Sequence, residues 1–298
     1  MKPSLAVAFA VALASVVAHA KGLPTAITQD PATDATHPAS TPSIQIASHG
    51  ALMNGRVYTP PGAGPHPVVV LLHGFPGNEQ NVDLAQAIRR AGWAVVTFNY
   101  RGSWGSGGTF TFDGAVADGV AALAWVRDPA NANKLRIDPT RVAMIGHSWG
   151  GYVTASACAA DAKLLGCALI APWDVSADVA MVKDRTPEQR DGIARIAFDD
   201  VDGRLTGFTA RQTVDAIADR GSTFDLAKHA PGLADRRLLV VVASRDGDDC
   251  KALTLKPALE AAKAASFRFE TIESDHSFND RRIALAGTVL SWLDSLPH

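Results

Sequence analysis

The sequence is poor in cysteine, in aromatic residues and in net charge. Only 3 of its 298 residues are cysteine, 7% are aromatic, and 28 basic against 30 acidic side chains leave a formal net charge of −2. A net charge this close to zero does not indicate binding to nucleic acid or to another polyanion, so a small-molecule partner is expected. There is no CxxC pair or His-rich spacing, and no GK[ST] signature follows the glycine-rich stretch 102–108. Neither a metal nor any other cofactor is therefore expected.

The one long apolar run, Leu5–Ala18, is short for a bilayer span. It follows Lys2 and ends in Ala18-His19-Ala20, a small-x-small cleavage pattern. Residues 1–20 therefore predict a signal peptide cleaved after Ala20, and a secreted or periplasmic protein without a stable membrane anchor. No cysteine follows this site, so no lipid anchor is indicated. Residues 21–43 contain four prolines among Thr, Ala and Ser, which predicts a flexible leader.

The three cysteines are Cys158, Cys167 and Cys250, and an odd number leaves at least one without an internal partner. An oxidising compartment would permit a Cys158–Cys167 disulfide across a short loop. Three buried thiols are an equally good reading of the same residues.

From Ile44 onward, apolar runs alternate with segments of helical periodicity. Continuous apolar runs are typical of parallel strands covered on both faces, and each parallel crossover needs a helix. The prediction is one α/β domain over 44–298, with a mostly parallel central sheet and helices on both faces. Strands are expected at 44–46, 51–59, 68–72, 93–98, 141–146, 167–171, 238–243 and 267–272. Residues 172–235 are helical, charged and too long for a loop, which predicts a helical cap inserted over the site.

An apolar run beginning at Val142 stops at Gly146-His147-Ser148-Trp149-Gly150, and small residues follow. This pattern predicts a strand, a tight turn and a helix start, with the serine held out at the turn. A serine hydroxyl attacks a carbonyl only when a base removes its proton, so such a turn must present Ser148 to a base. The backbone N–H of Trp149 can then point at a developing oxyanion.

With these flanks, the chain resembles the α/β-hydrolase family from about Ile44 to the C-terminus. The resemblance implies a second oxyanion donor in an HG-x-x-G loop after an early strand. The stretch from His73 to Gly77 matches that loop, and Phe75 occupies the donor position. A plain Gly/Pro turn is the alternative. The Arg101 loop resembles that of bacterial serine hydrolases and of prolyl-oligopeptidase-like catalytic domains.

In this family the chain order is serine, acid and then histidine. His276 follows the last predicted strand and is the expected base. Asp246 follows the strand 238–243 and is the expected acid. Asp248 and Asp249 lie further around the same turn, where they are better placed to cap the next helix, and Asp275 directly precedes the histidine. Asp249 is the second choice for the acid.

Trp104, Trp173 and Phe278 are candidates to line an acyl or leaving-group pocket, although each could equally be core or cap packing. The predicted protein is an exported serine hydrolase that cleaves a carboxylic ester through an acyl-enzyme. A small peptidase, a thioesterase or lactonase, and an inactive hydrolase-like binding protein are the alternatives. The expected partner is a small ester or a short peptide, and nothing in the sequence indicates an oligomeric state.

Overall fold

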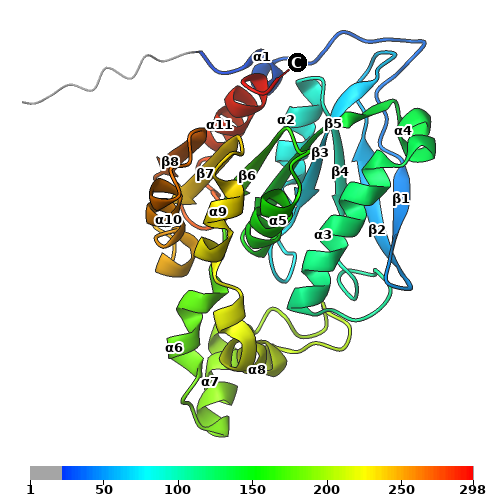
Figure 1. The fold of residues 1–298 in the computed structure, drawn as a ribbon. Helices are drawn as coiled ribbons and strands as arrows, with labels where there is room; N and C mark the ends of the chain where they lie inside the picture. The colour runs from blue at the N-terminus through cyan, green and yellow to red at the C-terminus, as the bar shows by residue number, and fades with distance from the viewer. Residues whose placement is uncertain (1–21, 298) are drawn as a thin grey trace, which may run out of the picture.

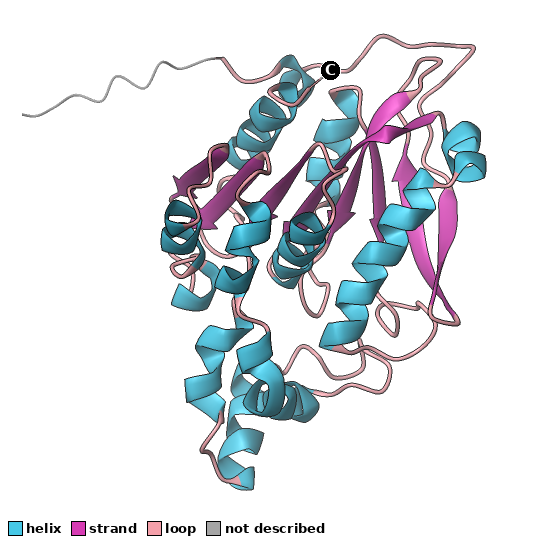
Figure 2. Ribbon diagram, viewed as in Figure 1, coloured by secondary structure: helices cyan, strands magenta, loops and turns pink. Residues whose placement is uncertain are grey.

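A computed structural model describes residues 22–297, and the predicted signal peptide, residues 1–20, lies outside them. The chain forms an eight-stranded sheet in the order β1-β2-β4-β3-β5-β6-β7-β8 (Figures 1 and 2). β1 pairs antiparallel with β2, β2 pairs antiparallel with β4, and all the other pairs are parallel. The strands are β1 (Ser43–Ser48), β2 (Ala51–Tyr58), β3 (His66–Leu72), β4 (Ala94–Phe98), β5 (Ile137–His147), β6 (Gly166–Ile170), β7 (Leu238–Ala243) and β8 (Phe267–Ile272).

Helices cover both faces of the sheet, as the sequence predicts. On one face α2 packs beside α11, and on the other α3 packs beside α5, which in turn contacts α9 (Figure 1). β6 and β7 are buried at every position, because apolar side chains on both of their faces meet helices. The helices are α1 (Thr25–Thr28), α2 (Val82–Arg90), α3 (Phe112–Arg127), α4 (Pro129–Leu135), α5 (Trp149–Ala160), α6 (Val179–Val182), α7 (Pro187–Ala197), α8 (Ala210–Arg220), α9 (Ala230–Leu233), α10 (Leu255–Ala261) and α11 (Arg282–Asp294).

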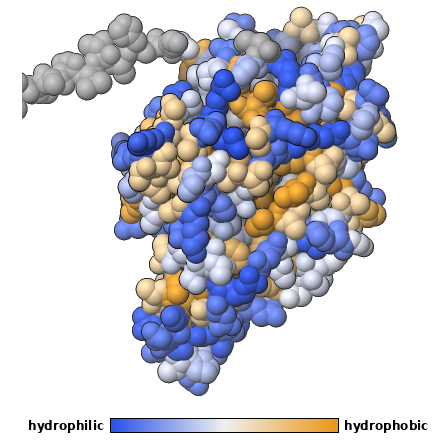
Figure 3. Space-filling view, viewed as in Figure 1, coloured by the Kyte–Doolittle hydropathy of each residue, from blue (hydrophilic) through white to orange (hydrophobic). Residues whose placement is uncertain are grey.

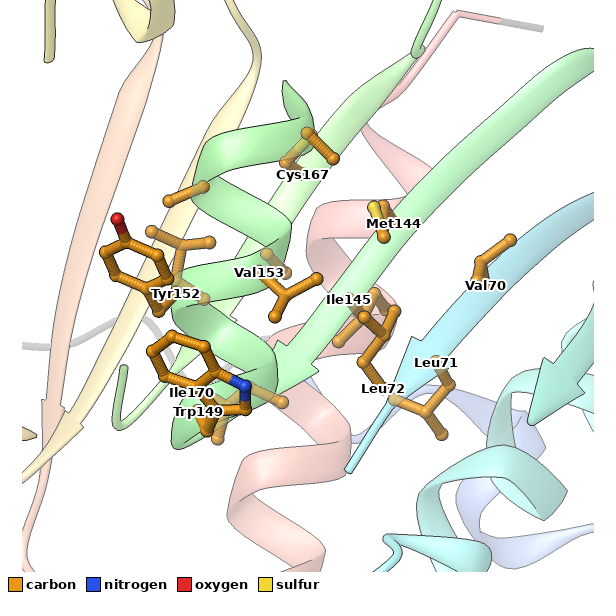
Figure 4. Packing of buried hydrophobic residues seen from close by; sticks show 14 of the residues in the cluster. Val70, Leu71, Leu72, Met144, Ile145, Trp149, Tyr152, Val153, Cys167 and Ile170 are labelled. Atoms are coloured by element: carbon orange, nitrogen blue, oxygen red, sulfur yellow. The ribbon is translucent and has the colours of Figure 1, made fainter. Parts of the chain in front are cut away.

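The centre of the core lies between β3, β5 and α5, where apolar side chains from the two strands face the helix (Figure 4). The Trp149 indole stacks on the Tyr152 ring, with centroids 4.8 Å apart and planes 7° apart. A Cβ atom at Gly146 would collide with the carbonyl oxygen of Gly150, so only glycine permits α5 to start this close to β5. The sequence motif therefore fixes the spacing of strand and helix.

Between β6 and β7 the chain leaves the sheet and builds the cap, which contains α6, α7 and α8 (Figure 1). Arg190 of α7 pairs with Asp215 of α8 at 3.0 Å, and Arg211 of α8 pairs with Asp191 of α7 at 2.6 Å. The cap surface is largely hydrophilic in the view of Figure 3. The cap helices are therefore held together by charged side chains as well as by a small apolar interior.

The last part of the predicted cap, 172–235, packs differently from the rest. α9 lies against α5 beside the sheet, and a Cβ atom at Gly232 would meet the backbone of Ala159 at 2.8 Å. This short helix is the crossover that returns the chain to β7. The part of the insertion that stands over the carboxyl ends of the strands therefore ends before α9.

Residues 22–42, the part of the predicted leader 21–43 that the structure describes before β1, contact the domain at several points. Arg90 of α2 donates to the Ala26 carbonyl at 2.6 Å, and Ser40 pairs with Thr59 in an antiparallel bridge. Ile27 packs against the hydrophobic core. Composition alone gives no sign of these contacts, because their partners lie in distant parts of the chain.

Cys158 of α5 and Cys167 of β6 form a disulfide, and Cys250 is a buried free thiol. This settles the alternative that the sequence left open, because α5 and β6 run side by side after the connecting turn. Within residues 22–297, none of the helices combines the length and the hydrophobicity that crossing a bilayer would need.

Candidate active site

Ser148 lies at the sharp turn between β5 and α5, with φ 56° and ψ −123°. This left-handed φ is unusual for a residue with a side chain and points the hydroxyl away from the strand axis. A Cβ atom at Gly74 would lie 2.7 Å from the Ser148 Cβ, so the loop after β3 passes directly beside the serine. The predicted elbow and the predicted HG-x-x-G loop are thus neighbours in space.

His276 and Asp246 come together from the loops after β8 and β7. These strands are parallel neighbours, so their carboxyl ends open at the same edge of the sheet. The Nδ1 atom of His276 lies 2.7 Å from Oδ2 of Asp246. The Asp246 side chain is 8% exposed, and that of His276 is 37% exposed. A carboxylate can only accept, so Nδ1 carries the proton and Nε2 is left free to accept one.

The competing acids are engaged elsewhere. Asp275 accepts from the backbone N–H and the side-chain amide of Asn279, at 2.8 and 2.9 Å. Asp248 is 82% exposed and pairs with Lys251 at 3.2 Å. Asp249 accepts from the Cys250 thiol at 3.3 Å. Among these four carboxylates, Asp246 is the one that reaches the His276 imidazole.

Ser148, His276 and Asp246 all open onto one cavity of about 330 Å³ beneath the cap. The loops after β3, β5, β7 and β8 form its floor, and cap residues form its roof. The remaining lining residues are Phe75, Pro76, Trp173, Asp178, Met181, Ala197, Phe198, Asp200, Asp249 and Cys250. This volume suits a small organic molecule.

Two backbone N–H groups are available beside Ser148. Trp149 is the first residue of α5, and Phe75 follows Gly74 in the adjacent loop. Within residues 22–297, neither N–H donates to a protein acceptor. Both therefore remain free to bind an oxygen atom of a ligand.

His147, next to the serine, is buried and contacts the backbone of His276. Its Nε2 atom donates to the backbone carbonyl of His276 at 2.9 Å. Burial, followed by the nearby His276, lowers the pKa of His147 to about 3, so its imidazole is neutral. A neutral donor there holds the His276 backbone in place without adding charge.

The three predicted pocket residues have three different positions. Trp173 lines the cavity and donates from Nε1 to Asp178 at 2.8 Å. Trp104 does not line it; this exposed side chain donates to the Pro76 carbonyl at 2.8 Å and packs over Gly77. Phe278 is fully buried in the core, so the prediction of a pocket role for Phe278 is wrong. Its backbone has the left-handed φ of 56°, and its side chain is not among those that line the cavity.

Several lining residues were not predicted from the sequence to face the site, chiefly Asp178 and Phe198 of the insertion and Cys250 after β7. Burial, and then the neighbouring carboxylates Asp249 and Asp174, raise the pKa of Asp178 to about 6 even though Trp173 donates to it. Phe198 lies 6.4 Å from Trp173, ring centre to ring centre. For Asp178 and Phe198 the only sequence signal was the presence of acidic and aromatic side chains in the predicted cap, which does not say which of them face inward.

The serine turn, the free N–H groups and the order of serine, acid and histidine define a protein of the α/β-hydrolase class. The profile of the alpha/beta hydrolase family matches residues 69–288. The chain therefore belongs to the alpha/beta hydrolase family, which confirms the resemblance seen in the elbow motif.

Curated relatives match only part of the chain. It is 28% identical over 124 residues to an uncharacterized protein of Mycobacterium tuberculosis, covering 41% of this chain and 42% of that protein. It is 34% identical over 88 residues to the lysophosphatidylserine lipase ABHD12 of Danio rerio, covering 28% of this chain and 21% of the lipase. The chain thus matches less than half the length of these relatives.

Solved structures match far more of the chain, at low identity. The 2,6-dihydroxy-pseudo-oxynicotine hydrolase has a TM-score of 0.64 at 16% identity, covering 88% of this chain and 68% of its own. The esterase Pf2001 of Pyrococcus furiosus has a TM-score of 0.63 at 14% identity, covering 87% and 91%. Est1E from Butyrivibrio proteoclasticus has a TM-score of 0.59 at 15% identity, covering 84% and 97%. At such identities the likeness shows the fold.

Proposed function

We propose that this hydrolase cleaves small carboxylic esters through an acyl-enzyme, with Ser148 as nucleophile, His276 as base and Asp246 as the acid. The observation that carries the proposal is the hydrogen bond of 2.7 Å between His276 and Asp246 at the edge of a cavity that also exposes Ser148. This arrangement supplies the base and the tautomer control that a serine nucleophile needs.

In the first step the Ser148 oxygen bonds to the ester carbonyl carbon, and its proton passes to Nε2 of His276. The carbonyl oxygen becomes an oxyanion, which the N–H groups of Phe75 and Trp149 stabilise by about 3 kcal/mol each. The imidazolium then gives its proton to the departing alcohol as the carbon–oxygen bond breaks. Water repeats the sequence on the acyl-enzyme, releasing the acid and restoring Ser148. Asp246 stays ionised and stabilises the imidazolium.

The size and lining of the cavity favour esters with a short acyl or aromatic group. Phe75, Trp173 and Phe198 present rings to its interior. One solved structure of Est1E, which shares the fold, is described with bound ferulic acid, an aromatic carboxylic acid. The cap α6–α8 roofs this cavity, and we propose that it sets substrate preference.

A peptidase is the second candidate from the sequence, through the Arg101 loop. Arg101 makes a structural ion pair with the buried Asp118 at 2.6 Å and is absent from the cavity lining. The loop thus supports the fold and adds no support for peptide binding.

Labelling and kinetics together test the proposed function. A fluorophosphonate probe should label the wild type and not Ser148→Ala, and ester turnover should fall by about 10⁵ to 10⁶ in that variant. Ser156→Ala is the matched control, since Ser156 lies two helical turns further along α5. Side-by-side rates on p-nitrophenyl esters and aminoacyl p-nitroanilides decide between esterase and peptidase. If the Ser148→Ala variant took up the probe at the wild-type rate, the assignment of Ser148 as nucleophile would be overturned.

We also propose export with cleavage after Ala20, which rests on the sequence pattern of residues 1–20. Intact-mass measurement of protein released from the periplasm or medium should give Lys21 as the first residue. A retained Met1 would contradict it.

A further inference from the structure

Cys250 lines the cavity and has no role in the proposed ester hydrolysis. It lies in the short 3₁₀ segment Asp248–Cys250 after β7 and is 5% exposed. Ligand atoms of Asp246, Cys250 and His276 all lie within 4.8 Å of one another. A carboxylate, a thiol and an imidazole are the three side-chain groups that bind Zn²⁺ in proteins.

From this cluster we propose that Asp246, Cys250 and His276 form a binding site for a divalent transition-metal ion such as Zn²⁺, and that the bound ion inhibits the enzyme. The inhibitory part rests on the proposed function, because the metal would occupy the base and the acid of the hydrolytic reaction. Metal binding itself does not depend on it.

The distances between the ligand atoms of these three residues suit a tetrahedral metal ion after a small rearrangement. Zn²⁺ bonds of about 2.0 to 2.3 Å place neighbouring ligand atoms roughly 3.5 Å apart. His276 Nδ1 and Asp246 Oδ2, at 2.7 Å, are closer than this, so the ion has to break their hydrogen bond and separate them. The His276 side chain is 37% exposed, so protein atoms do not enclose it on every side.

Charge favours the same ion. Binding requires the Cys250 thiolate, whose proton leaves to solvent, and a His276 imidazole whose proton has moved from Nδ1 to Nε2 by exchange with solvent. The thiolate and the Asp246 carboxylate then neutralise Zn²⁺, and the complex is neutral. Asp249, whose Oδ2 lies 3.3 Å from the Cys250 sulfur, is outside this group of three ligands and adds negative charge beside it. Among residues 22–297, the side chains that line this cavity include no lysine or arginine.

The chain offers a clean spectroscopic test. Cys158 and Cys167 are joined, so Cys250 is the remaining thiol of the three cysteines. Cobalt(II) bound at the site should therefore give a thiolate-to-cobalt charge-transfer band that arises from Cys250 alone. The band should appear in the wild type and in Ser148→Ala, and disappear in Cys250→Ser.

Calorimetric titration with Zn²⁺ is the second measurement. One ion should bind per chain, with affinity reduced more than about tenfold in Cys250→Ser and in His276→Ala, since even indirect supports of a ligand carry that much. Ser148→Ala should bind as the wild type does. The same Zn²⁺ concentrations should inhibit wild-type hydrolysis and inhibit Cys250→Ser correspondingly less.

Absence of the cobalt band in the wild type would overturn the proposal even if Cys250→Ser failed to fold. Unchanged zinc affinity in a folded Cys250→Ser would also overturn the proposal, and would assign the zinc binding to histidines other than His276. A protein that binds cobalt through the thiol but hydrolyses no ester would keep the metal site and refute the proposed function. A protein that hydrolyses esters but binds neither cobalt nor zinc would keep the proposed function and refute the metal site.

Discussion

Replacing Asp246 by Asn should remove most of the hydrolytic rate while leaving the fold intact. Asp246 holds the proton of His276 on Nδ1 through a bond of 2.7 Å. An Asn amide has nearly the same shape, but its NH₂ group can donate to Nδ1 and so drive the proton to Nε2. The imidazole then faces Ser148 with an N–H and cannot accept the hydroxyl proton.

The expected loss in kcat is about 10⁴-fold, as for the equivalent change in other serine hydrolases with this triad. At 1.36 kcal/mol per factor of ten, this loss corresponds to about 5.4 kcal/mol of transition-state stabilisation. The loss should appear mainly in kcat, because the tautomer affects proton transfer more than substrate binding. Burst and steady-state rates on a p-nitrophenyl ester, with a thermal melt to verify folding, measure it.

Two matched variants control for the local charge. Asp248→Asn removes an exposed carboxylate from the same turn, and Asp275→Asn removes the one directly before the histidine. Surface changes of this kind shift free energies by about 0.5 kcal/mol, so both should stay within about threefold of the wild-type rate. Near-normal turnover in Asp246→Asn, with collapse in Asp249→Asn, would refute the reasoning and move the role to Asp249.

Two further predictions concern stability. Asp118→Ala should cost about 3 to 5 kcal/mol in urea unfolding because it leaves the largely buried Arg101 guanidinium without its carboxylate partner. Asp113→Ala, which breaks an exposed pair with Arg220, should cost under about 1 kcal/mol, and equal costs would contradict this. Because the folded pKa of His147 is about 3, below its usual 6.5, the unfolded chain binds more protons between these values and stability should fall as pH falls from 6.5 toward 3. His147→Gln should flatten that decline in pH-dependent melts, and an unchanged slope would show that burial of this imidazole is not its cause.

The sequence by itself determined the sheet. β7 and β8 span 238–243 and 267–272, the ranges expected from their apolar runs. A strand buried on both faces must be apolar throughout, and such a run is visible without any knowledge of its neighbours. The order of Ser148, Asp246 and His276 was likewise readable, because motif and strand order place them on loops that open at the same edge.

Only the tertiary structure decided which loop and cap side chains face the cavity. Trp173 faces it, whereas Phe278 is buried and Trp104 is bound to the Pro76 carbonyl. It also joined Cys158 to Cys167 and brought Cys250 to His276. In a loop, backbone angles and packing against distant segments set the direction of a side chain, and no local period records them. The residues of the cavity thus follow from long-range contacts, which exist only once the sheet has assembled.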